Sequence, residues 1–136
     1  MRAIARPTLV IALGFAGLVH LVLGPEHLAQ SALMGGAMTA AGVAQLLLSA
    51  ATARSAFDRF VRAAVPVLSI ALVAAWVIAV TIGLPVEPHA HAAGAIADHG
   101  PAGHVEPVSV IGSVTALAEL GAAVLVGLMS LPGKRP

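Results

Sequence analysis

The sequence contains no cysteine and no tyrosine, and its 136 residues include only one tryptophan and three phenylalanines. Without cysteine the chain can form no disulfide, no thiolate metal site, no iron–sulfur cluster and no cysteine nucleophile. Charged residues are also scarce, at 10% against about 25% in soluble domains. Since hydrophobic residues make up 59%, the chain lacks the polar surface that water would require. The composition therefore predicts an integral membrane protein in contact with the lipid bilayer.

Four apolar stretches are each long enough to cross a bilayer as a helix. We expect one domain, residues 1–136, of fold class all-α: an integral membrane up-down four-helix bundle. The helices are expected at these approximate ranges: 8–23, 25–53, 56–83 and 107–131. Gly24-Pro25 is predicted to form the turn into the second helix, and Ser55 to Asp58 a capping box for the third.

The charges are segregated between the two ends of these stretches. All seven basic residues flank one end: Arg2, Arg6, Arg54, Arg59, Arg62, Lys134 and Arg135. Basic connections are retained in the cytoplasm during insertion, so the protein is predicted to lie in the plasma membrane with both termini in the cytoplasm. The first stretch also resembles a signal peptide, but Gly24-Pro25-Glu26-His27 is a poor cleavage site and we expect retention. Basic residues at span ends do not indicate nucleic-acid binding.

Histidines and carboxylates on the outer side form two candidate metal sites. The first lies around the predicted turn and comprises His20, Glu26 and His27. The second is the outer His-rich loop at 84–106, with His89, His91, His99 and His104. Imidazole and carboxylate groups are ligands of copper(II), nickel and zinc, and His89 and His91 can face one ion from an extended segment. The same residues also suit a proton relay, or interfacial positions and a solvated linker without any ligand.

Glu119 lies at the centre of the fourth apolar stretch, where an ionised carboxylate is expensive. Its neighbours at helical spacing are small, so Glu119 is predicted to point into the bundle. Gln45 in the second stretch is the natural hydrogen-bond partner. The pair is either an interhelical contact that fixes the register of the helices or a buried proton or cation site.

The stretch from Gly17 to Leu48 contains His20-Leu21, Pro25-Glu26-His27-Leu28 and Gly42-Val43-Ala44-Gln45-Leu46-Leu47-Leu48. It resembles small bacterial four-helix multi-pass membrane proteins, either DoxX-like or of unassigned function. This resemblance covers about a quarter of the chain and implies an up-down four-helix bundle. Ala118-Glu119-Leu120-Gly121 with Gly127-Leu128 is similar to the carboxylate-bearing last helix of four-helix rotary-ATPase proteolipids. The chain lacks the repeated glycine ladder of those proteins, so their function is not transferred.

No phosphate-binding glycine loop, HExxH motif or plausible Ser/His/acid set is present, so we expect no enzymatic activity. The leading hypothesis is a non-enzymatic membrane protein whose outer His/Glu cluster and loop bind a transition metal or respond to protons. One alternative is an accessory or structural subunit of a larger membrane complex. Another is a small proton-coupled transporter, oligomeric in the membrane, that uses Glu119.

The metal hypothesis predicts that the detergent-purified protein binds about one copper, zinc or nickel ion per chain through its histidines. His89→Ala/His91→Ala is expected to abolish binding if the loop holds the ion, and His20→Ala/His27→Ala if the first cluster does. Metal content and metal titration of the wild type beside both double variants distinguish the two sites. Wild-type protein that retains no metal and binds none below millimolar concentration would contradict the hypothesis.

Overall fold

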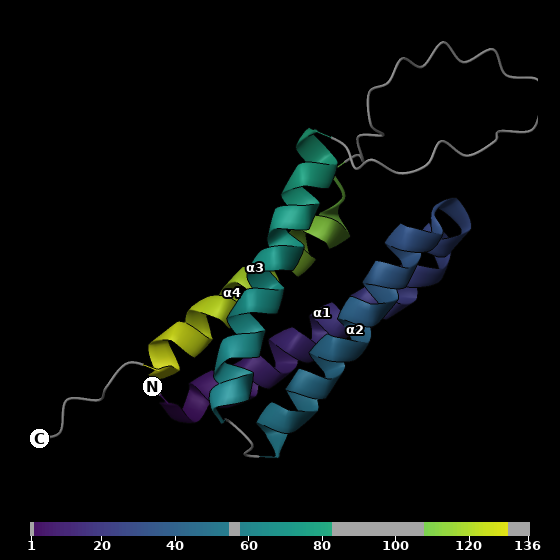
Figure 1. The fold of residues 1–136 in the computed structure, drawn as a ribbon. Helices are drawn as coiled ribbons and strands as arrows, with labels where there is room; N and C mark the ends of the chain where they lie inside the picture. The colour runs from purple at the N-terminus through teal and green to yellow at the C-terminus, as the bar shows by residue number, and fades with distance from the viewer. Residues whose placement is uncertain (1, 55–57, 83–107, 131–136) are drawn as a thin grey trace, which may run out of the picture.

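The computed structural model describes residues 2–54, 58–82 and 108–130, which form four α-helices (Figure 1). These are α1 (Arg2–Gln30), α2 (Ala32–Ala53), α3 (Arg59–Thr81) and α4 (Val110–Ser130). Each helix is long and apolar enough to cross a membrane. The prediction of an all-α protein with four candidate membrane spans is therefore confirmed.

The turn between α1 and α2 lies at Ser31, not at Gly24-Pro25 where the sequence predicted it. Ser31 has an extended backbone, and its hydroxyl accepts a hydrogen bond from the Met34 amide at 3.3 Å, so it is the N-cap of α2. Pro25 removes only one hydrogen bond from α1, and apolar spans tolerate such a loss where a neighbouring helix packs closely. As a consequence, His20 lies well inside α1, and Glu26 belongs to the end of α1 rather than to the start of α2.

Glycines bring α1 and α2 into backbone contact along an antiparallel hairpin. A Cβ atom on Gly17 would lie 2.9 Å from the Gly42 carbonyl oxygen, and one on Gly42 would lie 2.8 Å from the Gly17 carbonyl oxygen. Nearer the turn, a Cβ atom on Gly24 would lie 2.6 Å from Thr39 Oγ1. Small residues allow membrane helices to approach closely, and dispersion contacts between the backbones then hold them together. The contact also fixes the register of the two helices.

Arg6, near the start of α1, forms hydrogen bonds to the end of α2 at the other end of this hairpin. Its Nε donates to the Thr52 carbonyl at 2.9 Å, and its Nη2 donates to the Ala53 carbonyl at 2.7 Å. These carbonyls belong to the last turn of α2, which lacks intrahelical donors and carries partial negative charge. Ser49 Oγ adds a hydrogen bond to the Val10 carbonyl at 2.9 Å. The start of α1 is thus locked to the end of α2.

The helices of the second hairpin begin with side-chain caps. Asp58 accepts from the Val61 amide at 2.9 Å, so α3 starts at Arg59, later than the predicted start at 56. Ser55 of the predicted capping box lies outside the described residues. Ser109 accepts from the Gly112 amide at 2.9 Å and caps α4, whose predicted start at 107 also falls outside the described residues.

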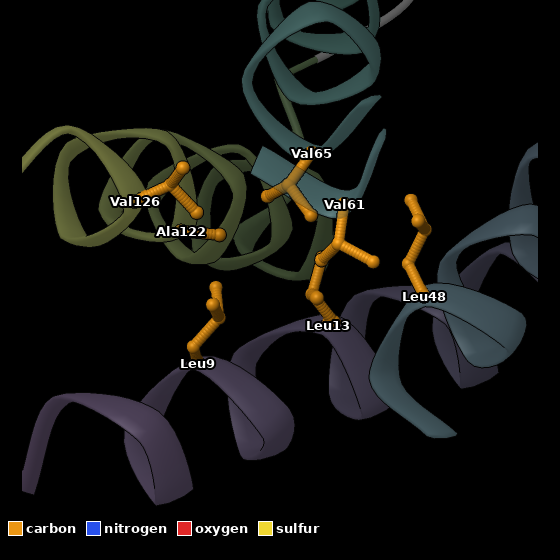
Figure 2. Packing of buried hydrophobic residues seen from close by; sticks show 7 residues of the cluster. All are labelled: Leu9, Leu13, Leu48, Val61, Val65, Ala122 and Val126. Atoms are coloured by element: carbon orange, nitrogen blue, oxygen red, sulfur yellow. The ribbon is translucent and has the colours of Figure 1, made fainter. Parts of the chain in front are cut away.

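The apolar core joins the two hairpins at one end of the bundle. Figure 2 shows its seven residues, which come from all four helices: Leu9, Leu13, Leu48, Val61, Val65, Ala122 and Val126. They lie toward the start of α1 and the end of α4. In Figure 1 the two hairpins are close together at this end and separate toward the α1–α2 turn. We call these two ends the core end and the turn end.

Gly42→Ala is expected to destabilise the protein by about 1–3 kcal/mol, because the new methyl group would overlap a backbone carbonyl that cannot move without separating α1 from α2. Gly36→Ala on the same helix is the matched control, since a Cβ atom there meets nothing within 4 Å. Unfolding by denaturing detergent in mixed micelles measures both. Equal stability of the two variants would show that the Gly17–Gly42 contact does not hold the hairpin.

Candidate functional site: a buried His–Gln–Glu triad

Three polar side chains from three helices meet inside the apolar bundle: His20 of α1, Gln45 of α2 and Glu119 of α4. Gln45 is completely buried, Glu119 is 3% exposed, and the side chain of His20 is 12% exposed. Gln45 Nε2 donates to Glu119 Oε1 at 2.9 Å, and His20 Nδ1 lies 3.0 Å from Gln45 Oε1. His20 Nε2 lies 3.8 Å from Glu119 Oε1. The Gln45–Glu119 contact predicted from the sequence is present, and His20 joins it.

The triad lies near the middle of the bundle's length. Glu119 is nine residues from the start of α4, which corresponds to about 14 Å along the helix axis at 1.5 Å per residue. The charged side chains of the surrounding helices lie near the helix ends, and no other charged side chain lies at this level among the described residues. The three side chains replace the hydrogen bonds of water mainly with one another, and His20 also contacts the backbone of its own helix.

The close contact of α1 and α2 places His20 beside Gln45. The His20 ring folds back along α1, with Nδ1 at 2.9 Å from the Ala16 carbonyl oxygen. This brings the ring to the level of Gly17, where a Cβ atom would lie 3.2 Å from Gln45 Cβ. The missing side chain at Gly17 thus lets Gln45 approach α1 closely enough to contact the imidazole. The site depends on the glycine contact as directly as on its own polar groups.

The hydrogen-bond partners determine where the imidazole proton lies. The Ala16 carbonyl can only accept, so Nδ1 carries a hydrogen, which Gln45 Oε1 also accepts. In the neutral ring the lone pair is then on Nε2, which faces the Glu119 carboxyl group. One proton, carried by either Nε2 or the carboxyl group, gives an imidazolium–carboxylate pair or a neutral pair, and both have zero net charge. A second proton, or the loss of the first, leaves a net charge inside the apolar bundle.

A half-open cavity of about 80 Å³ adjoins the triad on the side of the turn end. Its lining residues come from all four helices: Val19, His20, Leu23, Met38, Leu72, Trp76, Gly112, Thr115, Ala116 and Glu119. The apolar core lies on the opposite side of the triad. His20 and Glu119 therefore line the end of this half-open cavity that is nearer the core, and packed side chains close the core end beneath them.

Ser69 of α3 is an additional polar residue near this level. Its hydroxyl is enclosed and is the single fully buried side-chain polar atom in the described part of the chain that lacks a hydrogen-bond partner. Ser69 precedes the cavity-lining residues Leu72 and Trp76 on one helix face, since the spacings of three and seven residues share a face. Buried hydroxyl groups are normally hydrogen-bonded. Ser69 Oγ can therefore donate to or accept from a further polar group if one comes within reach of α3.

The predicted cluster of His20, Glu26 and His27 is not assembled as expected. His20 turns to the triad, Glu26 is exposed, and His27 Nδ1 lies 3.0 Å from the Leu23 carbonyl oxygen. Within residues 2–54, 58–82 and 108–130, no group of three His, Asp or Glu side chains is placed to hold a metal ion. The loop histidines lie outside the described residues: His89, His91, His99 and His104. Metal binding by copper, zinc or nickel stays a prediction.

Two site features were missed from the sequence. His20 was assigned to the outer surface because the turn was placed at Gly24-Pro25. Trp76 lines the cavity, although it is not among the site residues predicted from the sequence. The spacing of Gly17 and Gly24 against Gly35 and Gly42 was the available signal, since glycines seven residues apart on both stretches indicate an antiparallel contact with that register.

Comparison of the chain with protein-family models, with curated proteins and with solved structures found no match. The resemblances to DoxX-like proteins and to rotary-ATPase proteolipids are therefore predictions that no relative supports. The triad and its cavity are therefore the features of the molecule that bear on function.

Gln45→Leu is expected to destabilise the protein by about 1–3 kcal/mol, because it removes the donor to a buried carboxyl group. The double variant Gln45→Leu/Glu119→Leu is expected to recover most of this loss, since apolar replacement of both partners leaves no unpaired group between them. Unfolding of the wild type, both single variants and the double variant in mixed micelles gives the interaction energy. Additive losses would show that the two side chains do not interact.

Proposed function

We propose that the protein is a non-enzymatic, small proton-coupled transporter, with His20, Gln45 and Glu119 as its proton-binding site. The observation that carries the proposal is the position of the His20–Glu119 pair, on the floor of a cavity near the middle of the bundle. Intramembrane ionisable residues that pair with each other beside a cavity are typical of proton relays and ion pathways. The accessory-subunit alternative requires neither the pair nor the cavity.

The proton that His20 and Glu119 share also links the two hairpins. His20 and Gln45 belong to the α1–α2 hairpin, and Glu119 belongs to α4. With one shared proton the pair is neutral overall and attracts α4 to α1. A second proton protonates both groups and leaves a positive charge, so this attraction is lost. Protonation thus acts directly on the distance between the hairpins.

The structure offers a hinge for this movement. The core packs the hairpins together at the core end, whereas α2 and α3 make only slight contact and the hairpins separate toward the turn end. Cooperative packing at one end and weak packing at the other favour rotation about the core end. The cavity would then widen or close while the core stays intact.

The charge segregation supports an orientation for this transporter. Arg6, Arg54, Arg59 and Arg62 belong to the helix ends at the core end, and basic flanks are retained in the cytoplasm. We therefore propose an up-down topology in the cytoplasmic membrane, with both termini inside and the cavity open to the outside. In this orientation the apolar core separates the proton site from the cytoplasm.

Lowering the pH from about 8 to about 5 is expected to separate the hairpins at the turn end. Because the chain has no cysteine, spin labels can be placed at Leu33→Cys and Ile82→Cys, two exposed positions there. We expect the mean label distance in nanodiscs to increase by at least about 2 Å. Glu119→Gln should abolish this change, because it removes the shared proton.

The control label pair is Ile4→Cys with Leu128→Cys, both exposed at the core end. Its distance should stay constant over the same pH range, since the apolar core holds those segments together. A turn-end distance that is independent of pH, or that changes equally in the Glu119→Gln variant, would refute proton coupling through the triad.

A further inference from the structure

We infer that the cavity above the triad binds a small alkylammonium cation in exchange for the proton on His20 and Glu119. The inference rests on the proposed function, because it names the substrate class of the same site. The arrangement that carries it is a carboxyl group beside an imidazole in a cavity whose walls are mainly apolar and include the only tryptophan of the chain.

The carboxyl group has one oxygen available to a ligand. Oε1 takes both polar contacts of Glu119, from Gln45 and His20. Oε2 makes no hydrogen bond with the described residues, and Glu119 lines the cavity. A carboxylate oxygen of this kind accepts hydrogen bonds from an ammonium group and stabilises its charge.

The cavity walls favour a cation with alkyl groups over a hydrated ion. Val19, Leu23 and Leu72 contribute aliphatic surface, which stabilises methyl or methylene groups rather than a hydration shell. Trp76 contributes an aromatic ring, the side chain that binds alkylated ammonium groups best. The Thr115 hydroxyl hydrogen is already donated to the Ile111 carbonyl at 2.8 Å, so it is not available to hydrogen-bond a ligand in the cavity.

Charge excludes the opposite ligand class. No Lys or Arg lines the cavity, and the described basic side chains are at the core end, on the far side of the apolar core. An anion would therefore meet the Glu119 carboxyl group without any compensating positive charge except a protonated His20. A cation meets one titratable partner from α1, His20, and one from α4, Glu119, while α2 and α3 contribute no titratable group at this level.

The cavity volume limits the size of the cation. A buried apolar cavity of about 150 Å³ holds a benzene molecule, so about 80 Å³ corresponds to roughly three to four non-hydrogen atoms. Dimethylammonium, ethylammonium and trimethylammonium have this size. Because the cavity is half-open, a longer alkyl chain could extend toward the turn end, but the charged nitrogen would still lie beside Glu119.

Exchange of the cation for a proton keeps the charge of the site balanced. When the cation binds, Glu119 must be ionised to pair with it. The proton that His20 and Glu119 share therefore leaves to solvent, and the neutral imidazole retains its Nδ1 hydrogen. Cation binding and protonation then exclude each other, which is the coupling that an exchanger requires.

The test uses trimethylammonium chloride and the full-length protein in weakly buffered detergent solution near neutral pH. Trp76 is the single tryptophan, so the intrinsic tryptophan fluorescence reports on the cavity alone. We expect a saturable fluorescence change together with release of about one proton per chain, measured with a pH dye. Sodium chloride controls for ionic strength, and tert-butanol is the neutral control of similar size.

Variants separate the carboxyl group from the cavity walls. Glu119→Gln should abolish proton release and weaken binding at least tenfold, whereas Glu26→Gln, which neutralises an exposed carboxylate on α1, should leave both unchanged. Leu72→Phe keeps the carboxyl group but fills the cavity, and it should also prevent the fluorescence change. Circular dichroism of each variant verifies that it is folded.

Three results would overturn the inference: no fluorescence change with trimethylammonium, equal binding of tert-butanol, or binding without proton release. If these occur while the pH-dependent separation of the hairpins persists, the cation is excluded and proton coupling stands. If the separation and cation binding are both absent in the folded wild type, the proposed function fails as well.

Discussion

The backbone contact between Gly17 and Gly42 is the constraint on which the rest of the structure depends. It brings α1 and α2 so close that neither position can hold a side chain without a shift. The same approach sets the level at which the His20 ring meets Gln45, and Gln45 in turn presents its amide to Glu119. A contact without any polar side chain thus determines the geometry of the buried His–Gln–Glu triad.

Much of the fold could be predicted from composition and charge, because a membrane leaves few choices for an apolar chain of this length. The Glu119–Gln45 contact was also predictable, since a buried carboxyl group needs a donor and few donors occur in the spans. The position of His20 was not, because Pro25 signals a turn in water but is tolerated inside a membrane helix. The cavity forms where the two hairpins separate, and no local sequence pattern predicts the angle between the hairpins.

The bundle is packed differently on the two sides of the triad along its axis, and this difference determines from which side the triad can be reached. Leu9, Leu13 and Leu48 pack on one side of it, while the cavity lies on the other. A polar site packed on both sides would serve only to fix the register of the helices. A site closed on one side and accessible on the other can exchange a proton or a ligand with a single compartment at a time.

The hydrogen bonds from Arg6 to the end of α2 have a consequence for how the bundle is assembled. Their partners are separated by fewer than fifty residues, so the α1–α2 hairpin can close while the rest of the chain is still being synthesised. Docking of Glu119 onto Gln45 joins residues 74 positions apart and must follow. Insertion and final packing are therefore separate events. A triad with one unpaired member would therefore leave the first hairpin intact and weaken only the last step of assembly.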